Sequence, residues 1–338
     1  MTGRRAPLPG GRRSSAGTAL TAVCGRRTLL LGALALAGCA GPGSAPTRRS
    51  RQLFVATGNT TGVYYQLGGG LADLISQHLP GYEATAEPTG ASVENIQRVV
   101  RGDADLAFTL ADTAGDAATG KGPFEGRPQP IRALAKLYLN YTQVIARTGS
   151  GVRSLADMRG KRISTGSPRS GTEVIALRLL AAAGIGPDDI TGQPLSLPQT
   201  VKGMLTGSTD AMVYSSGLPA SGITELFASG PGKVEFLSPT GVLPRLSQQY
   251  GDAYTGATIP RGAYNLPADV ATIGVPNLLV VRDTMPEALA HDLVKLLFDR
   301  QKDLAKVHPE AGNIDRATAG STAPVPLHAG AARFHAGR

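Results

Sequence analysis

The chain has 338 residues, of which 34 are Lys or Arg and 25 are Asp or Glu, and its formal net charge is +9. Residues 1–38 hold six arginines and no acid, and Arg48, Arg49 and Arg51 follow, so residues 52–338 are neutral overall. Without a basic surplus, the folded part lacks the electrostatic footprint of a nucleic-acid-binding protein. The length predicts about two domains.

The first 38 residues have the pattern of a secretory signal peptide. Basic residues precede an apolar run from Leu29 to Ala37. The run ends in Leu36-Ala37-Gly38-Cys39, which resembles the lipobox of bacterial lipoproteins, where cleavage leaves a diacylated cysteine. We therefore predict a signal peptide over 1–38 and, over 39–51, a lipidated Cys39 followed by a flexible Gly/Pro-rich linker. A chance cysteine is the alternative, and the Arg26-Arg27 pair fits both twin-arginine and Sec export.

The two cysteines bear on both redox chemistry and location. Cys24 leaves with the leader and Cys39 is the predicted lipid site, so the folded part has no thiol for a disulfide or a Cys-based metal site. No later apolar run approaches the roughly 20 residues of a membrane span. We expect an extracytoplasmic protein, anchored by lipid to the outer face of the cytoplasmic membrane.

Short apolar runs alternate with helical patterns from Gln52 onward, which is typical of an α/β fold with a mainly parallel sheet. The first part of this pattern predicts strands over 53–56, 82–87 and 105–109, and helices over 63–78 and 92–101.

The same order recurs further along the chain. It predicts strands over 162–164, near 194–197 and over 210–214, and helices over 171–183 and 199–205. Gly102 and Gly207 occupy matching places, where each glycine can end a helix in the left-handed region. We expect a second lobe built like the first, although any two α/β units share such glycines. A helix from Pro286 to about His308 follows, and its leucines at helical spacing are predicted core.

The segment from Ala56 to Gly70, "ATGNTTGVYYQLGGG", lies where phosphate-binding loops occur, but it fits neither nucleotide motif. No charged residue occurs from Gln52 to Ala72, so a small monoanion such as one carboxylate suits it better than a triphosphate. Tyr64 offers a hydroxyl and an apolar wall. Alternatively, Thr60 or Thr61 merely caps the helix and the tyrosine fills the core.

Two further helix starts have the same chemistry. In the loop 165–172, Ser170 or Thr172 is a predicted cap, and Arg169 either grips a carboxylate at two points or is a solvated surface arginine. In the segment 90–95, Ser92 starts a helix and is either a ligand contact or a plain cap. Together they predict a cleft that grips one small anion from opposite sides, beyond the carboxyl ends of parallel strands.

Catalytic motifs are missing from the sequence. The five histidines fall at helix ends and in the tail, and no HExxH, GxSxG or paired-carboxylate pattern stands out. We expect no enzyme activity, no cofactor and no metal.

Several motifs resemble one family. "TGNTTGVYYQLGGGLA", "TGASVENIQRVVRGDADLAF", "GKRISTGSPRSGTE", "TDAMVYSSGLP" and "PVPLHAGAARF" are similar to motifs of the TAXI-type solute-binding proteins of TRAP transporters. The resemblance implies a two-lobed type II periplasmic-binding-protein fold, with each lobe a mainly parallel sheet flanked by helices and the ligand cleft between them. The first lobe would comprise 52–140 plus 275–338, and the second 141–274.

The resemblance also implies a function. Family members bind glutamate, glutamine or other small carboxylates by lobe closure and deliver them to an ion-coupled TRAP-type permease. We expect this chain to be such a binding protein and a monomer. An ABC-importer binding protein, an exported hydrolase and a sensor domain are the alternatives.

Ligand contacts follow by motif. They would come from Gly58, Thr61, Tyr64, Ser92 and Asn95 in the first lobe, and from Thr165, Arg169, Ser170, Gly171, Thr172, Ser215 and Ser216 in the second. The chain departs from the family pattern at Leu110-Ala111-Asp112, at Asn140 and at Arg169. These departures favour a ligand that is more acidic, or carries less amine, than glutamate.

Overall fold

The computed structural model describes residues 50–337, which lie within one compact unit, Arg48–Arg338. The predicted signal peptide and the lipid site at Cys39 lie outside the described residues and stay predictions. Within the described part, no helix is long and apolar enough to cross a membrane.

Ten strands and ten α-helices follow one another in the described residues. The strands are β1 (Arg51–Ala56), β2 (Tyr82–Glu87), β3 (Leu106–Leu110), β4 (Ile131–Arg147), β5 (Arg162–Ser164), β6 (Thr191–Gln193), β7 (Ala211–Ser216), β8 (Val234–Leu237), β9 (Thr255–Ile259) and β10 (Val270–Arg282). The helices are α1 (Val63–His78), α2 (Ser92–Arg101), α3 (Ala111–Thr119), α4 (Gly171–Ala182), α5 (Leu197–Thr206), α6 (Ser221–Ser229), α7 (Leu243–Tyr250), α8 (Glu287–Asp299), α9 (Gln301–Val307) and α10 (Ala329–Ala336).

One arrangement of strands and helices occurs twice. β1 pairs in parallel with both β2 and β3, and β5 pairs in parallel with both β6 and β7. Parallel neighbours need a crossover connection, which α1 and α2 supply in the first case and α4 and α5 in the second. Gly102 and Gly207 end α2 and α5 with φ of 81° and 79°. The recurrence predicted from the sequence is confirmed, including these two left-handed glycines.

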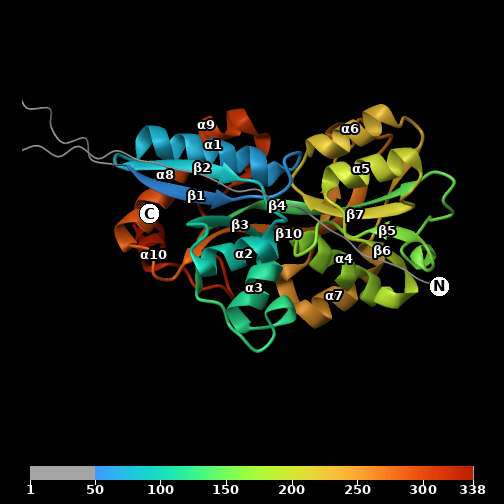
Figure 1. Ribbon diagram of the computed structural model, residues 1–338, viewed down its shortest axis with the longest axis horizontal. Coiled ribbons are helices and arrows are strands. Elements are labelled where there is room, and N and C mark those ends of the chain that lie inside the picture. Colours follow the sequence, from blue (N-terminus) through green and yellow to red (C-terminus); the bar gives the residue numbers. More distant parts are fainter. Residues whose placement is uncertain (1–49, 338) are drawn as a thin grey trace, which may run out of the picture. The chain divides into compact units, whose positions relative to one another are not determined.

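Two long strands join the repeated units into one sheet with the order β2-β1-β3-β10-β4-β7-β5-β6 (Figure 1). β10 pairs antiparallel with β3 and β4, and β4 pairs antiparallel with β7. The sheet is therefore mixed, whereas each repeated unit is parallel. The predicted lobe borders, 140/141 and 274/275, fall inside β4 and β10 and remain a prediction. Below, "first lobe" and "second lobe" denote these predicted ranges.

Two predicted elements differ from the structure. The strand expected near 194–197 is wrong, because β6 ends at Gln193 and α5 begins at Leu197. The Ser196 N–H donates to Gln199 Oε1 at 3.0 Å, and Pro198 lies in the first turn, so this stretch has the chemistry of a helix start. The helix expected from Pro286 to His308 is two helices, because Arg300 leaves the helical conformation at φ −112° and ψ 15°.

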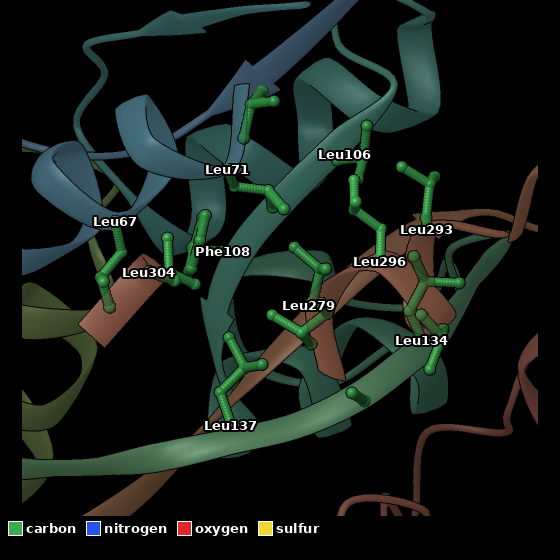
Figure 2. Close-up of a cluster of buried hydrophobic side chains, with 14 of the residues drawn as sticks. Leu67, Leu71, Leu106, Phe108, Leu134, Leu137, Leu279, Leu293, Leu296 and Leu304 are labelled. Carbon is green, nitrogen blue, oxygen red and sulfur yellow. The ribbon is translucent and has the colours of Figure 1, made fainter. Parts of the chain in front are cut away.

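The described residues form four clusters of buried apolar side chains, two mainly in the first lobe and two mainly in the second. In Figure 1, α1 and α9 lie on one side of β1 and β3, and α2 and α3 lie on the other. Figure 2 shows the largest cluster, where Leu67 and Leu71 of α1 face Phe108 of β3 and Leu279 of β10. The leucines predicted as core are all buried there: Leu289, Leu293, Leu296, Leu297 and Leu304.

Candidate functional site

A cavity of about 30 Å³ lies where the first turns of α1, α2 and α4 meet the end of β7. It is lined by Gly58, Asn59, Gly62, Val63, Tyr64, Gly90, Ala91, Ser92, Leu110, Asn140, Ser167, Ser170, Gly171, Thr172, Tyr214, Ser215 and Ser216. No Lys, Arg, His, Asp or Glu of the described residues is in this lining. We call α1, α2, the loops before them and the end of β3 the first wall, and α4, the loop before it and the end of β7 the second wall.

Three helix N-termini supply the polar character of the cavity. Residues Val63, Ser92 and Gly171, which begin α1, α2 and α4, all line it. The first N–H groups of a helix have no partner within the helix, and each N-terminus carries about half a positive charge. Ser170 Oγ accepts the N–H of Glu173 at 2.9 Å, which caps α4 at its third residue. Backbone N–H groups of three helices can therefore bind an anion without any charged side chain.

Glycines let the two walls approach each other closely. A Cβ on Gly171 would lie 2.6 Å from Ser92 Oγ and 2.5 Å from Leu110 Cδ1. A Cβ on Gly62 would lie 2.8 Å from the Tyr214 hydroxyl. All three distances are shorter than real Cβ contacts, so a side chain at either position would require the walls to shift.

A chain of hydrogen bonds forms the floor of the cavity and crosses from the first wall to the second. The Tyr64 hydroxyl donates to Asn277 Oδ1, and Asn277 Nδ2 donates to Asn140 Oδ1 at 2.7 Å. Asn140 Nδ2 in turn lies 3.4 Å from Ser215 Oγ. Since all these side chains are buried, the chain links α1, β10, β4 and β7 in one fixed arrangement.

The two tyrosines of the lining stay neutral. Burial raises the pKa of Tyr64 well above its ordinary value, and burial likewise raises the pKa of Tyr214. Each therefore keeps its hydroxyl proton at any physiological pH. The cavity therefore presents the free N–H groups of helix N-termini beside neutral side chains, and its lining has no countercharge for a cation.

Eight of the twelve predicted contact residues meet at this cavity. They are Gly58, Tyr64, Ser92, Ser170, Gly171, Thr172, Ser215 and Ser216. Ser170 is the cap of α4, as predicted, whereas α1 is preceded by Gly62 and neither Thr60 nor Thr61 caps it. Ser92 is likewise no plain cap, because α2 begins at this residue and its Oγ accepts the N–H of Leu110 at 3.1 Å.

Asn95 and Thr165 do not line the cavity. Asn95 Nδ2 donates to the carbonyls of Thr57 and Phe108 at 2.7 and 2.8 Å, so its side chain ties the end of β1 to β3. Thr165 continues β5, where its N–H donates to Gln193 O at 3.1 Å. Both residues are buried, and the Asn95 amide and the Thr165 N–H make hydrogen bonds within the protein.

Arg169 and Thr61 also lie elsewhere. Arg169 has a left-handed backbone (φ 60°), its side chain is 59% exposed, and its Nη2 lies 3.8 Å from Glu94 Oε2. Its backbone, rather than its guanidinium, contacts the other wall, because Arg169 O accepts the N–H of Glu94 at 3.0 Å. Thr61 packs against α6 instead of the cavity, with its Oγ1 3.0 Å from where a Cβ of Gly222 would be.

Sequence reasoning missed four polar residues at the site: Asn59, Ser167, Tyr214 and, beneath the lining, Asn277. Asn140, which the sequence marked only as a departure from the family pattern, also lines the cavity. A lone Asn inside the apolar strand "IGVPNLLVV" was the available signal for Asn277, since a buried amide needs partners. Elsewhere in the described residues, no group of three His, Cys, Asp or Glu side chains is placed to hold a metal.

Comparisons with known proteins agree on the fold. The model of one family, described as the NMT1-like family, matches residues 55–336. PhnD1 from Prochlorococcus marinus, solved in complex with methylphosphonate, is similar with a TM-score of 0.51 at 12% identity, over 77% of this chain and 90% of that one. A protein from Bordetella bronchiseptica RB50 has a TM-score of 0.50 at 17% identity, over 84% and 82%.

The alkanesulfonate-binding protein SsuA from Xanthomonas axonopodis pv. citri, bound to MOPS, has a TM-score of 0.47 at 17% identity, over 86% of this chain and 85% of that one. At such identities the likeness shows the fold alone. The fold is α/β, with a mixed sheet flanked by helices, and matches type II periplasmic-binding-protein structures.

Proposed function

The chain belongs to the NMT1-like family, and from this premise we propose that it is an extracytoplasmic solute-binding protein that captures a small carboxylate between its two lobes. The observation that carries the proposal is the convergence of three helix N-termini on one cavity without a charged side chain. Helix N-termini bind anionic groups through their free N–H groups and their positive end.

The chemistry of the lining favours one class of ligand. An amino acid brings an ammonium group whose charge a carboxylate would neutralise, and no carboxylate lines the cavity. A second carboxylate would add a negative charge that no side chain of the lining neutralises, since Arg169 lies outside the cavity and pairs with Glu94. Val63, Leu110 and Ala91 add apolar surface. We therefore propose a small monocarboxylate with an apolar or hydroxylated remainder, ahead of glutamate or a dicarboxylate.

Binding requires the walls to move. The cavity of about 30 Å³ is far below the roughly 300 Å³ of the smallest ordinary ligand sites. The walls come from opposite lobes and touch at Gly171, so a ligand enters only when the lobes separate. Closure around the ligand then buries it between the two walls, as hinge-type binding proteins do.

The proposed partner is a TRAP-type membrane permease, and the motifs that resemble TAXI-type proteins support it. In this role the protein is a monomer without enzyme activity, held at the outer face of the cytoplasmic membrane by a lipid on Cys39. An ABC importer is the second candidate partner. Co-purification of the anchored protein with its permease distinguishes the two, because the subunits of the two transporter types differ.

Thermal unfolding of the purified protein with a panel of compounds tests the ligand class. The panel contains propionate, butyrate, lactate and pyruvate, with succinate, glutamate, methylphosphonate and glucose for comparison. A bound monocarboxylate at about 100 times its dissociation constant adds roughly 2.7 kcal/mol of stability. We expect at least one monocarboxylate to raise the melting temperature more than glutamate, succinate and glucose do.

Other outcomes overturn parts of the proposal. A larger shift with glutamate would restore the amino-acid ligand that the family resemblance implies. A larger shift with methylphosphonate, the ligand in the PhnD1 structure, would replace the carboxylate by a phosphonate. A shift with glucose and with no anion would remove the anion site altogether.

A further inference from the structure

The loop from Gly58 to Gly62, here called the α1 loop, lines the first wall and also bonds to two helices of the second lobe. Leu197 N, the first N–H of α5, donates to Asn59 Oδ1 at 3.1 Å. At α6, Gly222 N and Ser221 Oγ donate to Thr61 O at 3.3 and 2.9 Å. The first turns of α5 and α6 are therefore completed by acceptors of the first lobe.

Asn59 joins this contact to the cavity itself. Asn59 lines the cavity, and its Nδ2 lies 3.2 Å from Ser167 Oγ, which lines the opposite wall. One half-buried side chain thus touches α5 and both walls. The next residue, Thr60, is exposed and does not belong to the lining.

The physical role of these bonds depends on the distance between the lobes. The first N–H groups of a helix have no acceptor within their own helix and turn to water when no other acceptor is present. The Asn59 amide and the Thr61 carbonyl replace that water only while the lobes are together. The Thr61 Oγ1 is buried without a hydrogen-bond partner in the described residues, and a Cβ at position 222 would lie 3.0 Å from it and 2.7 Å from Leu197 Cδ2. The surfaces therefore fit each other closely.

We propose that the α1 loop is a latch, in which Asn59 is the positioning residue that couples ligand contact at the start of α1 to docking of the α5 and α6 N-termini. Ligand held by the first turn of α1 fixes the loop, and the fixed loop offers its two acceptors to the second lobe. The latch slows lobe opening and hence ligand release. This inference rests on the proposed function, in which the lobes close on an anion.

Amide hydrogen exchange in the purified protein, followed by NMR, tests the latch directly. We expect the N–H groups of Leu197 and Gly222 to exchange more slowly than that of Glu287, the exposed first residue of α8. Asn59→Ala should speed exchange at Leu197 about fivefold, the effect of one ordinary hydrogen bond. Thr60→Ala, in the same loop, should leave exchange unchanged, and Asn59→Asp should keep the protection because it keeps an acceptor.

Hydrogen exchange measured with propionate, butyrate, lactate or pyruvate tests the latch and the proposed ligand class independently. An acid that binds should slow exchange further at Leu197 and Gly222 in the unchanged protein, and Asn59→Asp should lose this response because its charge repels the anion. Protection that is present but insensitive to every acid supports the docking of α5 and α6 on the α1 loop and contradicts the proposed ligand. Unprotected Leu197 and Gly222 in all conditions, or equal exchange in Asn59→Ala and Thr60→Ala, overturns the latch.

Discussion

Gly171 is the residue at which the two walls come closest. Because its Cβ would lie 2.5 Å from Leu110 Cδ1 and 2.6 Å from Ser92 Oγ, Gly171→Ala should keep the two walls from meeting in the proposed closed state. We expect the dissociation constant of the bound acid, measured by titration calorimetry, to rise at least tenfold, a loss of about 1.4 kcal/mol. The melting temperature without ligand should change little, since the alanine gains helix propensity where the glycine begins α4.

Gly69 provides the matched control for this substitution. It lies within α1, half-buried, and a Cβ there would meet nothing within 4 Å. Gly69→Ala should raise the free energy of unfolding by about 0.5–1 kcal/mol and leave ligand affinity unchanged. If Gly171→Ala bound the acid as tightly as Gly69→Ala, the contact between the walls would not exist in the bound state.

Individual residues of the site were predictable to different degrees. Ser170 and Gly171 follow from helix-start chemistry, which acts within a few residues of sequence. Arg169 was predicted to hold a ligand because its charge suits a carboxylate, yet Glu94, distant in sequence, takes its guanidinium. Asn140 and Asn277 meet only because β4 and β10 are neighbours, and no local pattern contains that pairing.

At the scale of elements, the Asp210 side chain links β4, β5 and β7 through hydrogen bonds. Its carboxylate accepts the N–H and the Nε of Arg162, which begins β5, at 3.0 and 2.9 Å. It also accepts from Arg147 Nη2, at the end of β4, at 3.2 Å. Asp210 itself precedes β7. Asp210→Asn should lower the free energy of unfolding in urea by about 2 kcal/mol, because charge-assisted hydrogen bonds are lost.

The same carboxylate makes this contribution depend on pH. Hydrogen bonds from the Arg162 side chain hold the pKa of Asp210 well below its ordinary value. A carboxyl with a lowered pKa in the folded state stabilises the fold above its unfolded value, about 3.9, and loses this effect as the pH falls further. The difference between the protein and Asp210→Asn should therefore be full at pH 6 and shrink below about pH 4. A constant difference would show that charge is not involved.

The elements show where sequence patterns suffice and where they fail. Both β-α-β-α-β units were predictable apart from β6, because the spacing of apolar residues within each helix and strand indicates which face is buried. The antiparallel strands β4 and β10 were not among the predicted elements, although they complete the sheet. β10 pairs with β3 of the first unit, and β4 pairs with β7 of the second. These pairings depend on how the two units assemble and not on the local sequence pattern.

At the scale of the whole molecule, a buried ionic cluster joins the two lobes. Arg178 of α4 pairs with Asp112 at 3.1 Å and with Asp116, both on α3, and the Tyr254 hydroxyl donates to Asp112 at 2.6 Å. The Arg178 guanidinium also lies 4.0 Å from the centre of the Tyr250 ring. Two carboxylates of the first lobe thus share one guanidinium of the second, and removing that cation leaves two buried charges unpaired.

Arg178→Met tests this link between the lobes. We expect urea unfolding at pH 7 to show a loss of about 3 kcal/mol, as when one partner of a buried ion pair is removed. Arg101→Met is the control, because its pair with Asp103 is exposed at 54% and 52%, and it should cost less than about 1 kcal/mol. Equal losses in the two variants would mean that the cluster does not hold the lobes together.

The pH dependence of Arg178→Met gives the sharper criterion. Burial raises the pKa of Asp116 above its ordinary value, against the lowering influence of Arg178. A carboxyl with a raised pKa in the folded state binds its proton more tightly there, so its stabilising effect is complete below its unfolded pKa, about 3.9, and is lost as the pH rises through the folded pKa. Without Arg178 that pKa rises further, and the variant's stability should fall more steeply with pH than that of the unchanged protein. The two unfolding curves should therefore approach each other below about pH 4 and separate toward pH 7, whereas a purely steric effect of the methionine would keep them a constant distance apart.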